Sequence, residues 1–253
     1  MLHQDGNGSR ALRQCLDEYR KTVPEGERAC VWAEAGVVPY KLCDGAFDCQ
    51  NCLFDMVMRG DWTFTAGRLS SRGGKIAPNC FYHANHTWAR VVEKANVRIG
   101  LDDFGQQLLG RIEKISLPIK GEKLGRKCIR LKGRGGVFSL TPPVEGFVLE
   151  VNETLITQPE LANTSPYDKG WMVLVRPSGL EKNLRNLIFG QNAYGWFEED
   201  VDRFAVLLAD LWLHNADREV GRTEQDGGAI DFSALDYLAP TKIRKVIGSF
   251  LGA

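Results

Sequence analysis

Four cysteines lie close together in the N-terminal part of this 253-residue chain, at positions Cys30, Cys43, Cys49 and Cys52. Their spacing is C-x12-C-x5-C-x2-C. A C-x2-C pair lets two thiolates converge on one ion, and two further cysteines complete a tetrahedral set. The spacing predicts a metal site, with structural Zn²⁺ as the first assignment and a 4Fe-4S cluster as the alternative, because both accept four thiolates. A set of free, partly buried thiols is the remaining interpretation.

The composition of the whole chain argues against some classes of binding function. Hydrophobic residues make up 43%, and 32 basic side chains balance 32 acidic ones. A zero net charge argues against broad electrostatic binding to nucleic acid or to an anionic membrane. The sequence has neither a signal-peptide pattern at its start nor an apolar run long enough to span a bilayer. We therefore expect a cytoplasmic protein, in which seven cysteines indicate metal ligands or free thiols rather than disulfides.

Other cysteines and histidines give weaker signals. Cys15 lies on the apolar stripe of a helix that Ser9 can cap, where it is expected to be a small buried hydrophobe. Cys80, His83 and His86 have the spacing C-x2-H-x2-H, which could supply a second metal site. In an extended segment, however, alternate side chains point to opposite faces and cannot all converge. We prefer the interpretation that the histidines anchor the start of the next domain.

Local patterns divide the chain into segments of different character. We expect a Cys-rich metal-binding region at 1–60, a polar Gly- and Ser-rich linker at 61–85, a β-rich domain at 86–178 and a helical extension at 179–253. In the β-rich part, strands are predicted at 97–101, 111–117, 147–151 and 171–176, with a helix between Asp102 and Gly110. In the extension, helices are predicted at 199–214 and from Pro240 onward.

A hairpin occupies the centre of the β-rich part. Two short apolar runs, 128–131 and 137–140, flank the sequence Lys132-Gly133-Arg134-Gly135-Gly136. Glycine supplies the positive φ angles that tight hairpin turns need. The pattern therefore predicts two paired strands that project a cationic, glycine-rich tip.

Several linked motifs in this region are shared with a known family. They are His86-Thr87-Trp88, Asp102-Asp103-Phe104-Gly105-Gln106-Gln107-Leu108-Leu109-Gly110, Pro143-Val144-Glu145-Gly146, Val151-Asn152-Glu153, Pro159-Glu160-Leu161-Ala162-Asn163 and Pro166-Tyr167-Asp168-Lys169-Gly170-Trp171-Met172. In this order and spacing they resemble the H protein of the glycine cleavage system, of the lipoyl and biotinyl carrier fold. The resemblance covers most of 86–178. It implies an α+β class with a β-rich hybrid barrel or sandwich and a projecting hairpin, flanked by N-terminal and C-terminal helical segments.

The hairpin tip departs from that family. The family carries Ser-Val-Lys-Ala there, and the lysine holds lipoic acid. Counting back from the Pro-Val-Glu-Gly turn places the lysine slot at Gly135, between Arg134 and Gly136. Glycine has no amine, and an arginine guanidinium stays protonated and is a poor acyl acceptor. Lys132 is the nearest lysine, but it lies outside the lipoylation pattern, so the resemblance implies a vacated attachment site and no lipoate.

Three functions remain compatible with these observations. The first is a non-enzymatic adaptor that binds a protein partner through the surface on which carriers dock, and that keeps a four-cysteine metal site. The second is an iron–sulfur electron-transfer protein. The third is an atypical lipoyl carrier that uses Lys132. No nucleophile motif, phosphate loop or paired-carboxylate signature is evident in the sequence, so we expect no catalytic activity.

Overall fold

The computed structural model describes residues 23–38, 40–43, 46–49, 52–58, 74–77, 79–92, 95–125, 128–213 and 231–252. The helix expected around Cys15 and most of the expected linker lie outside these ranges.

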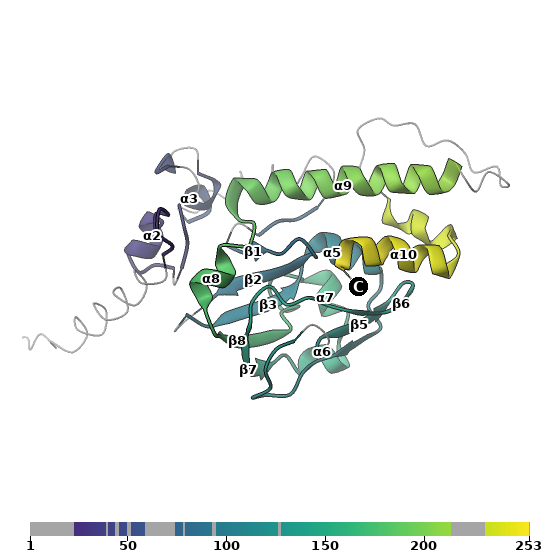
Figure 1. The fold of residues 1–253 in the computed structure, drawn as a ribbon, viewed down its shortest axis with the longest axis horizontal. Coiled ribbons are helices and arrows are strands. Elements are labelled where there is room, and N and C mark those ends of the chain that lie inside the picture. Colours follow the sequence, from purple (N-terminus) through teal and green to yellow (C-terminus); the bar gives the residue numbers. More distant parts are fainter. Residues whose placement is uncertain are drawn as a thin grey trace, which may run out of the picture.

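Two antiparallel sheets form the centre of the molecule (Figure 1). The larger sheet has the order β1-β2-β3-β8-β7 and the smaller one the order β4-β5-β6. The strands are β1 (Phe81–Tyr82), β2 (Thr87–Val91), β3 (Val97–Leu101), β4 (Lys114–Ser116), β5 (Arg130–Gly133), β6 (Gly136–Ser139), β7 (Gly146–Val151) and β8 (Val173–Pro177). Within the described residues the strands form these two sheets and no closed barrel, so the α+β fold is confirmed in its two-sheet form.

The larger sheet begins earlier than residue 86. Strand β1 lies inside the range 61–85, where we expected a linker, and it pairs with β2 in the register Phe81 opposite Ala89. Its two side chains are almost fully buried. The burial of two aromatic residues gives this short strand a stabilising contact that its length alone would not provide.

Helix α5 (Asp103–Leu109) begins and ends where the sequence predicts. The Asp102 carboxylate accepts a hydrogen bond from the Gly105 N–H at 2.8 Å, which satisfies one of the free amides of the first turn. Gly110 ends the helix with φ +60°. Two short helices, α6 (Thr154–Thr157) and α7 (Leu161–Thr164), follow strand β7.

The C-terminal extension folds back over the sheets. It contains α8 (Leu180–Leu184), α9 (Gly190–Leu213), the 3₁₀ helix η3 (Phe232–Tyr237) and α10 (Pro240–Leu251). The long helix α9 starts at Gly190, earlier than the expected 199, and crosses the molecule above β1 (Figure 1). Helix α10 contacts α5 and strand β6, so the end of the chain lies beside the hairpin.

The N-terminal segment packs at the β1 end of the larger sheet (Figure 1). It contributes α2 (Val31–Glu34) and α3 (Leu53–Met58). Buried side chains from this segment, from the sheets and from the C-terminal helices belong to one continuous hydrophobic cluster. No helix within the described residues has the length and apolar character needed to cross a membrane.

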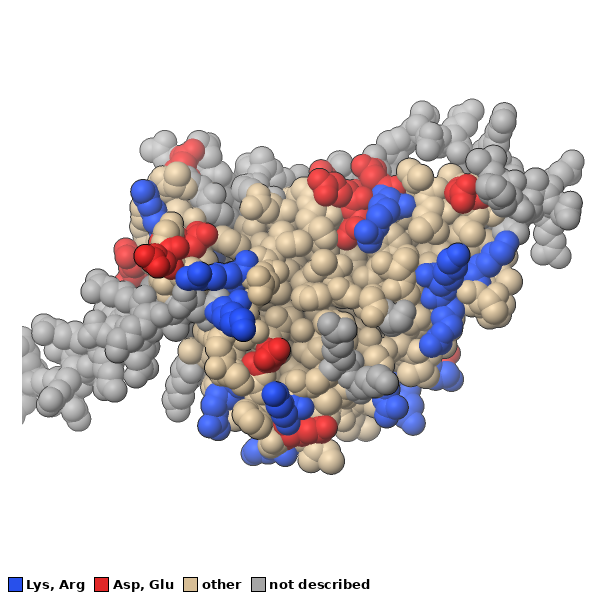
Figure 2. Space-filling model, viewed as in Figure 1, with Lys and Arg blue, Asp and Glu red and all other residues tan. Residues whose placement is uncertain are grey.

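Charged side chains do not concentrate on one large surface in the view of Figure 2. Acidic and basic groups lie in several small clusters, and uncharged residues form most of the central area. This distribution agrees with the balance of charges in the sequence.

Candidate functional sites

The hairpin tip has the geometry of a tight turn. Gly133 lies opposite Gly136 in the ladder between β5 and β6, so Arg134 and Gly135 form the turn itself. Gly135 has φ +78° and Gly136 has φ +116°. Residues other than glycine rarely adopt these angles, so the backbone of the turn favours glycine at both positions.

Helix α10 covers this tip. A Cβ atom at Gly135 would lie 2.9 Å from Ile243 Cγ2, and one at Gly136 would lie 3.1 Å from Arg244 Nη1. Arg244 also donates a hydrogen bond to the Val137 carbonyl at 3.3 Å. The tip that the sequence describes as a bare cationic loop is therefore in direct contact with the C-terminal segment.

Arg134 joins the tip to the C-terminal extension and to α5. Its Nε lies 2.6 Å from Asp236 Oδ1, and its guanidinium donates to the Phe232 carbonyl. Its backbone N–H donates to the Leu109 carbonyl at 2.7 Å. Only 14% of the Arg134 side chain is exposed. The positive charge of Arg134 is thus paired with groups of the same chain.

Lys132, the alternative amine, is held on strand β5. Its Nζ lies 2.7 Å from Glu113 Oε2, and both side chains are about half exposed. The hydrogen bond from Lys132, followed by its charge, lowers the pKa of the Glu113 carboxyl. This environment does not resemble a turn that presents a free lysine.

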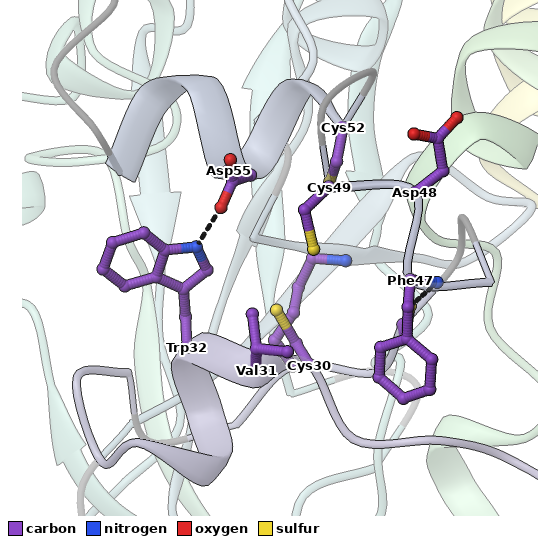
Figure 3. A pocket seen from close by; sticks show the side chains of 10 residues that line it. Cys30, Val31, Trp32, Phe47, Asp48, Cys49, Cys52 and Asp55 are labelled. Atoms are coloured by element: carbon purple, nitrogen blue, oxygen red, sulfur yellow. Dashed lines mark hydrogen bonds between the residues drawn. The ribbon is translucent and has the colours of Figure 1, made fainter.

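The four predicted cysteine ligands line one pocket. Cys30, Cys43, Cys49 and Cys52 share it with Val31, Trp32, Lys41, Phe47, Asp48 and Asp55. The pocket encloses about 310 Å³, including its open mouth. Figure 3 shows the sulfurs of Cys30 and Cys49 pointing toward each other from different segments. The fold thus brings together side chains that are up to 22 positions apart in sequence.

Backbone pairing positions two of these cysteines. Ala29 and Leu42 form an antiparallel bridge, so Cys30 and Cys43 lie on adjacent stretches. The Cys30 N–H donates to the Lys41 carbonyl at 2.8 Å, and the Cys43 N–H donates to the Arg28 carbonyl at 2.6 Å.

The other pair is held by turns. The Cys52 N–H donates to the Cys49 carbonyl at 3.3 Å, which closes the C-x2-C turn. The Phe47 N–H donates to Cys43 Sγ at 3.2 Å across a loop in which Phe47 has φ +67°. A backbone amide directed at a sulfur stabilises negative charge on that sulfur.

Charged groups border the pocket. Lys41 is only 4% exposed, and its ammonium donates to the Leu42 carbonyl at 2.8 Å. Asp55 accepts a hydrogen bond from Trp32 Nε1 at 2.8 Å. Burial raises the pKa of the Cys30 thiol, and neighbouring Cys52 adds to this effect, whereas the Trp32 backbone and the Lys41 charge oppose it.

The pocket is not arranged as a closed metal site. Within the described ranges, no group of three or more His, Cys, Asp or Glu side chains is placed so that it could hold a metal ion. The four thiols surround the pocket without meeting at one point. Metal binding therefore requires the cysteine side chains to turn inward and stays a prediction.

Cys80, His83 and His86 occupy separate environments. Cys80 is buried and accepts a hydrogen bond from Arg90 Nη2 at 3.4 Å. The His83 Nδ1 accepts from the Asn85 N–H at 3.1 Å. His86 is bound by two carboxylates that belong to other elements. This arrangement agrees with histidines that anchor the start of the domain.

His86 is fully buried between two carboxylates and two aromatic rings. Its Nδ1 lies 2.9 Å from Asp102 Oδ2 and its Nε2 lies 3.3 Å from Asp200 Oδ2. Its ring stacks between Phe104 and Trp196 at centroid distances of 4.3 and 4.9 Å. Burial lowers the pKa of His86, but the two carboxylates outweigh it and raise the pKa to about 9. The acidic partner on α9, 114 residues away, gives no local sequence signal.

Comparison with known proteins identifies the family. The family model described as glycine cleavage H-protein matches residues 80–200. The glycine cleavage system H protein 2 of Aquifex aeolicus is 31% identical over 142 residues, covering 54% of this chain and 88% of that protein. The glycine cleavage system H protein of Geobacillus kaustophilus is 41% identical over 103 residues, covering 40% of this chain and 80% of the relative.

A crystal structure of a glycine cleavage system H protein from Mycobacterium marinum is also similar. It is 25% identical, covers 49% of this chain and 99% of that chain, and has a TM-score of 0.43. The family match extends the shared region beyond 86–178 in both directions, to include β1, α8 and the first half of α9. Because the alignments cover 88% of the Aquifex aeolicus protein and 80% of the Geobacillus kaustophilus protein at 31% and 41% identity, the chain belongs to the glycine cleavage H-protein family.

Proposed function

We propose that this protein is a non-lipoylated member of the H-protein family that acts as an adaptor for a protein partner and catalyses no reaction itself. One observation carries the proposal. The attachment slot is Gly135, and the C-terminal helix covers it at a distance that would not accommodate even a methyl group. A swinging arm needs an amine that is free to move, and the tip offers neither the amine nor the space.

The cover on the tip is expected to be permanent. Helix α10 buries the apolar side chains of Ile243, Val246, Ile247, Phe250 and Leu251. Removing side chains of this size from water stabilises a fold by about 1.5–3 kcal/mol each. Release of α10 would expose these side chains to water and lose most of this stabilisation. We therefore infer that the partner binds away from the tip, rather than on the carrier docking surface that the sequence suggests.

Intact-mass spectrometry tests the absence of lipoate. The full chain is produced in a host that attaches lipoate to its own proteins, with free lipoate in the medium. We expect the unmodified mass, and a Lys132→Arg variant that differs only by the substitution. A lipoyl mass increase that disappears in Lys132→Arg would establish the atypical carrier instead.

Cross-linking in the native host tests the adaptor role. The full chain and an Arg134→Gln variant are compared, because the adaptor as proposed does not use the covered tip. Both should recover the same partner in repeated experiments, with cross-links outside 130–139. Failure to recover a reproducible partner would contradict the adaptor proposal. If the Arg134→Gln variant lost the partner, the partner would bind at the tip rather than away from it.

The four-cysteine pocket supports a second part of the proposal. We infer that it binds a metal, because the fold gathers all four sulfurs around one cavity from three separate segments. Structural Zn²⁺ is the preferred ion, and a 4Fe-4S cluster would instead make the protein an electron carrier. Reduced thiols require a reducing compartment, so we place the protein in the cytoplasm. Elemental analysis of the anaerobically purified chain separates zinc from iron.

A further inference from the structure

The described part of the N-terminal region, within 23–58, contains little regular secondary structure. Its helices α2 and α3 span only four and six residues. Isolated helices this short are unstable in water, so they depend on contacts with other parts of the molecule. The side chains of this segment that are described as buried and apolar are Cys30, Ala33, Tyr40, Leu42 and Phe54, and they pack in the same cluster as the sheets. A cross-link at the cysteines would add to this packing.

The position of the cysteines fits such a cross-link. Cys30 immediately precedes α2, Cys43 ends the bridged stretch 40–43, and Cys52 immediately precedes α3. One ion bound by all of them would join both helices to the bridged stretch. The C-x2-C turn and the Phe47 amide directed at Cys43 Sγ already fix the approach of two of the three segments.

The bridged stretch in turn contacts the body of the molecule. The ring of Tyr40 lies 5.8 Å from that of Phe81 on β1. The Lys41 ammonium lies 5.3 Å from the ring centre of Phe54 on α3 and 5.7 Å from that of Phe189, just before α9. Fixing α2 and α3 to 40–43 therefore also fixes them to the edge of the sheet.

A zinc ion with four thiolates would place negative charge in the pocket. Four thiols that lose their protons to solvent and bind Zn²⁺ give a site with net charge −2. The buried Lys41 ammonium lines the same pocket and offsets part of that charge, and the acidic residues Asp48 and Asp55 also line it. Trp32 and Phe47 also line the pocket.

From this arrangement we propose that Cys30, Cys43, Cys49 and Cys52 bind one structural Zn²⁺, and that the ion fastens segment 23–58 to the β1 edge of the sheet. This inference rests on the metal-binding part of the proposed function and adds the four ligands of the zinc ion and its task in the fold. The cysteine side chains turn inward when the ion binds, so that the four sulfurs meet in the pocket that they line.

Metal analysis of the full chain is the first test. We expect one zinc and no iron per chain in the wild type. The double variant Cys49→Ser, Cys52→Ser should fall below a tenth of that zinc content. The matched control is Cys128→Ser, because Cys128 lies outside the pocket in the β-rich region and is also partly exposed. That control should keep its zinc.

Titration of the metal-free wild type with Co²⁺ is a second test, which does not depend on the folding of a variant. Saturation at one equivalent, with ligand-field bands of a tetrahedral ion and thiolate charge-transfer absorption, supports the proposal. Stoichiometric iron with visible absorption would overturn zinc in favour of the redox protein. Absence of metal, with the thiols free or joined in disulfides, would overturn metal binding. None of these outcomes changes the lipoylation result, so the adaptor proposal succeeds or fails separately.

Hydrogen exchange tests the fastening. After chelation, the amides of Cys30 and Cys43, which bridge 28–30 to 41–43, should exchange at least tenfold faster. Amides in the ladder between β3 and β8 should keep their rates. If zinc is bound but chelation leaves the Cys30 and Cys43 amides protected, the ion does not fasten the segment and that part of the proposal is wrong.

Discussion

At the scale of single residues, the chemistry of the hairpin tip depends on two conditions that act on one position. Gly135 must adopt φ +78°, and it must lie against Ile243. The first condition is visible in the sequence as a glycine-rich turn. The second depends on a helix more than 100 residues later. Together they favour glycine at position 135, where we predict that the lipoyl lysine has been lost.

Alanine substitution separates the two conditions. Gly121 has φ +87° with open space around its Cβ position, so Gly121→Ala introduces only backbone strain, which costs about 1–2 kcal/mol. Gly135→Ala adds the contact with Ile243, and we expect a further loss of about 1–3 kcal/mol in the free energy of unfolding. Urea unfolding of both variants measures the difference. Equal losses would show that α10 does not press on the tip.

At the scale of secondary-structure elements, α10 is the part of the extension that closes the molecule. Phe250 is almost fully buried and lies 5.2 Å from the ring of Phe104 on α5 and 6.1 Å from that of Phe204 on α9. The guanidinium of Arg203 lies 4.2 Å from its ring centre. These contacts connect three helices through a single side chain.

Truncation of that side chain should be costly. We expect Phe250→Ala to lower the free energy of unfolding by about 3–5 kcal/mol, because a large buried side chain leaves a cavity among rigid neighbours. The control is Val206→Ala on α9, where 70% of the side chain is exposed and the change should stay within about 0.5 kcal/mol. Thermal or urea unfolding measures both. A small effect of Phe250→Ala would mean that α10 is only loosely attached.

At the scale of the whole molecule, His86 joins the larger sheet, α5 and α9. It precedes β2, pairs with Asp102 at the start of α5 and with Asp200 on α9, and lies between aromatic rings. Its pKa of about 9 compares with an ordinary value of 6.5. Because the folded state holds the proton more tightly, protonation of His86 stabilises the fold.

The resulting pH dependence has a definite sign. The contribution is complete below about pH 6.5 and is lost as the pH rises through about 9, which amounts to about 3 kcal/mol. We expect the free energy of unfolding to fall across this window in the wild type and to fall much less in His86→Asn. Asparagine tolerates the positive φ angle of His86.

His83→Asn provides the control for this measurement, because His83 is close in sequence but lies outside the carboxylate pair. Its urea unfolding should keep the wild-type pH slope. A slope that persists in His86→Asn would assign the proton uptake to another group.

Local residue patterns predict the secondary-structure elements, and linked motifs predict the family. Alternation at 97–101, the Asp102 cap, the glycine turn at 133–136 and the linked H-protein motifs all depend on neighbouring residues, and the structure confirms the corresponding elements. The four cysteines were also identifiable from their spacing, although their ligand role stays a prediction.

The contacts that cover the tip and surround His86 are visible only in the tertiary structure, because they join residues that are far apart in sequence. Ile243 meets Gly135, and Asp200 meets His86, across separations of more than 100 residues. Apolar periodicity predicts that a helix such as α10 buries one face, but it does not name the surface that receives it. That choice depends on the shape and charge of distant elements once they are packed, and here α10 packs against the hairpin tip.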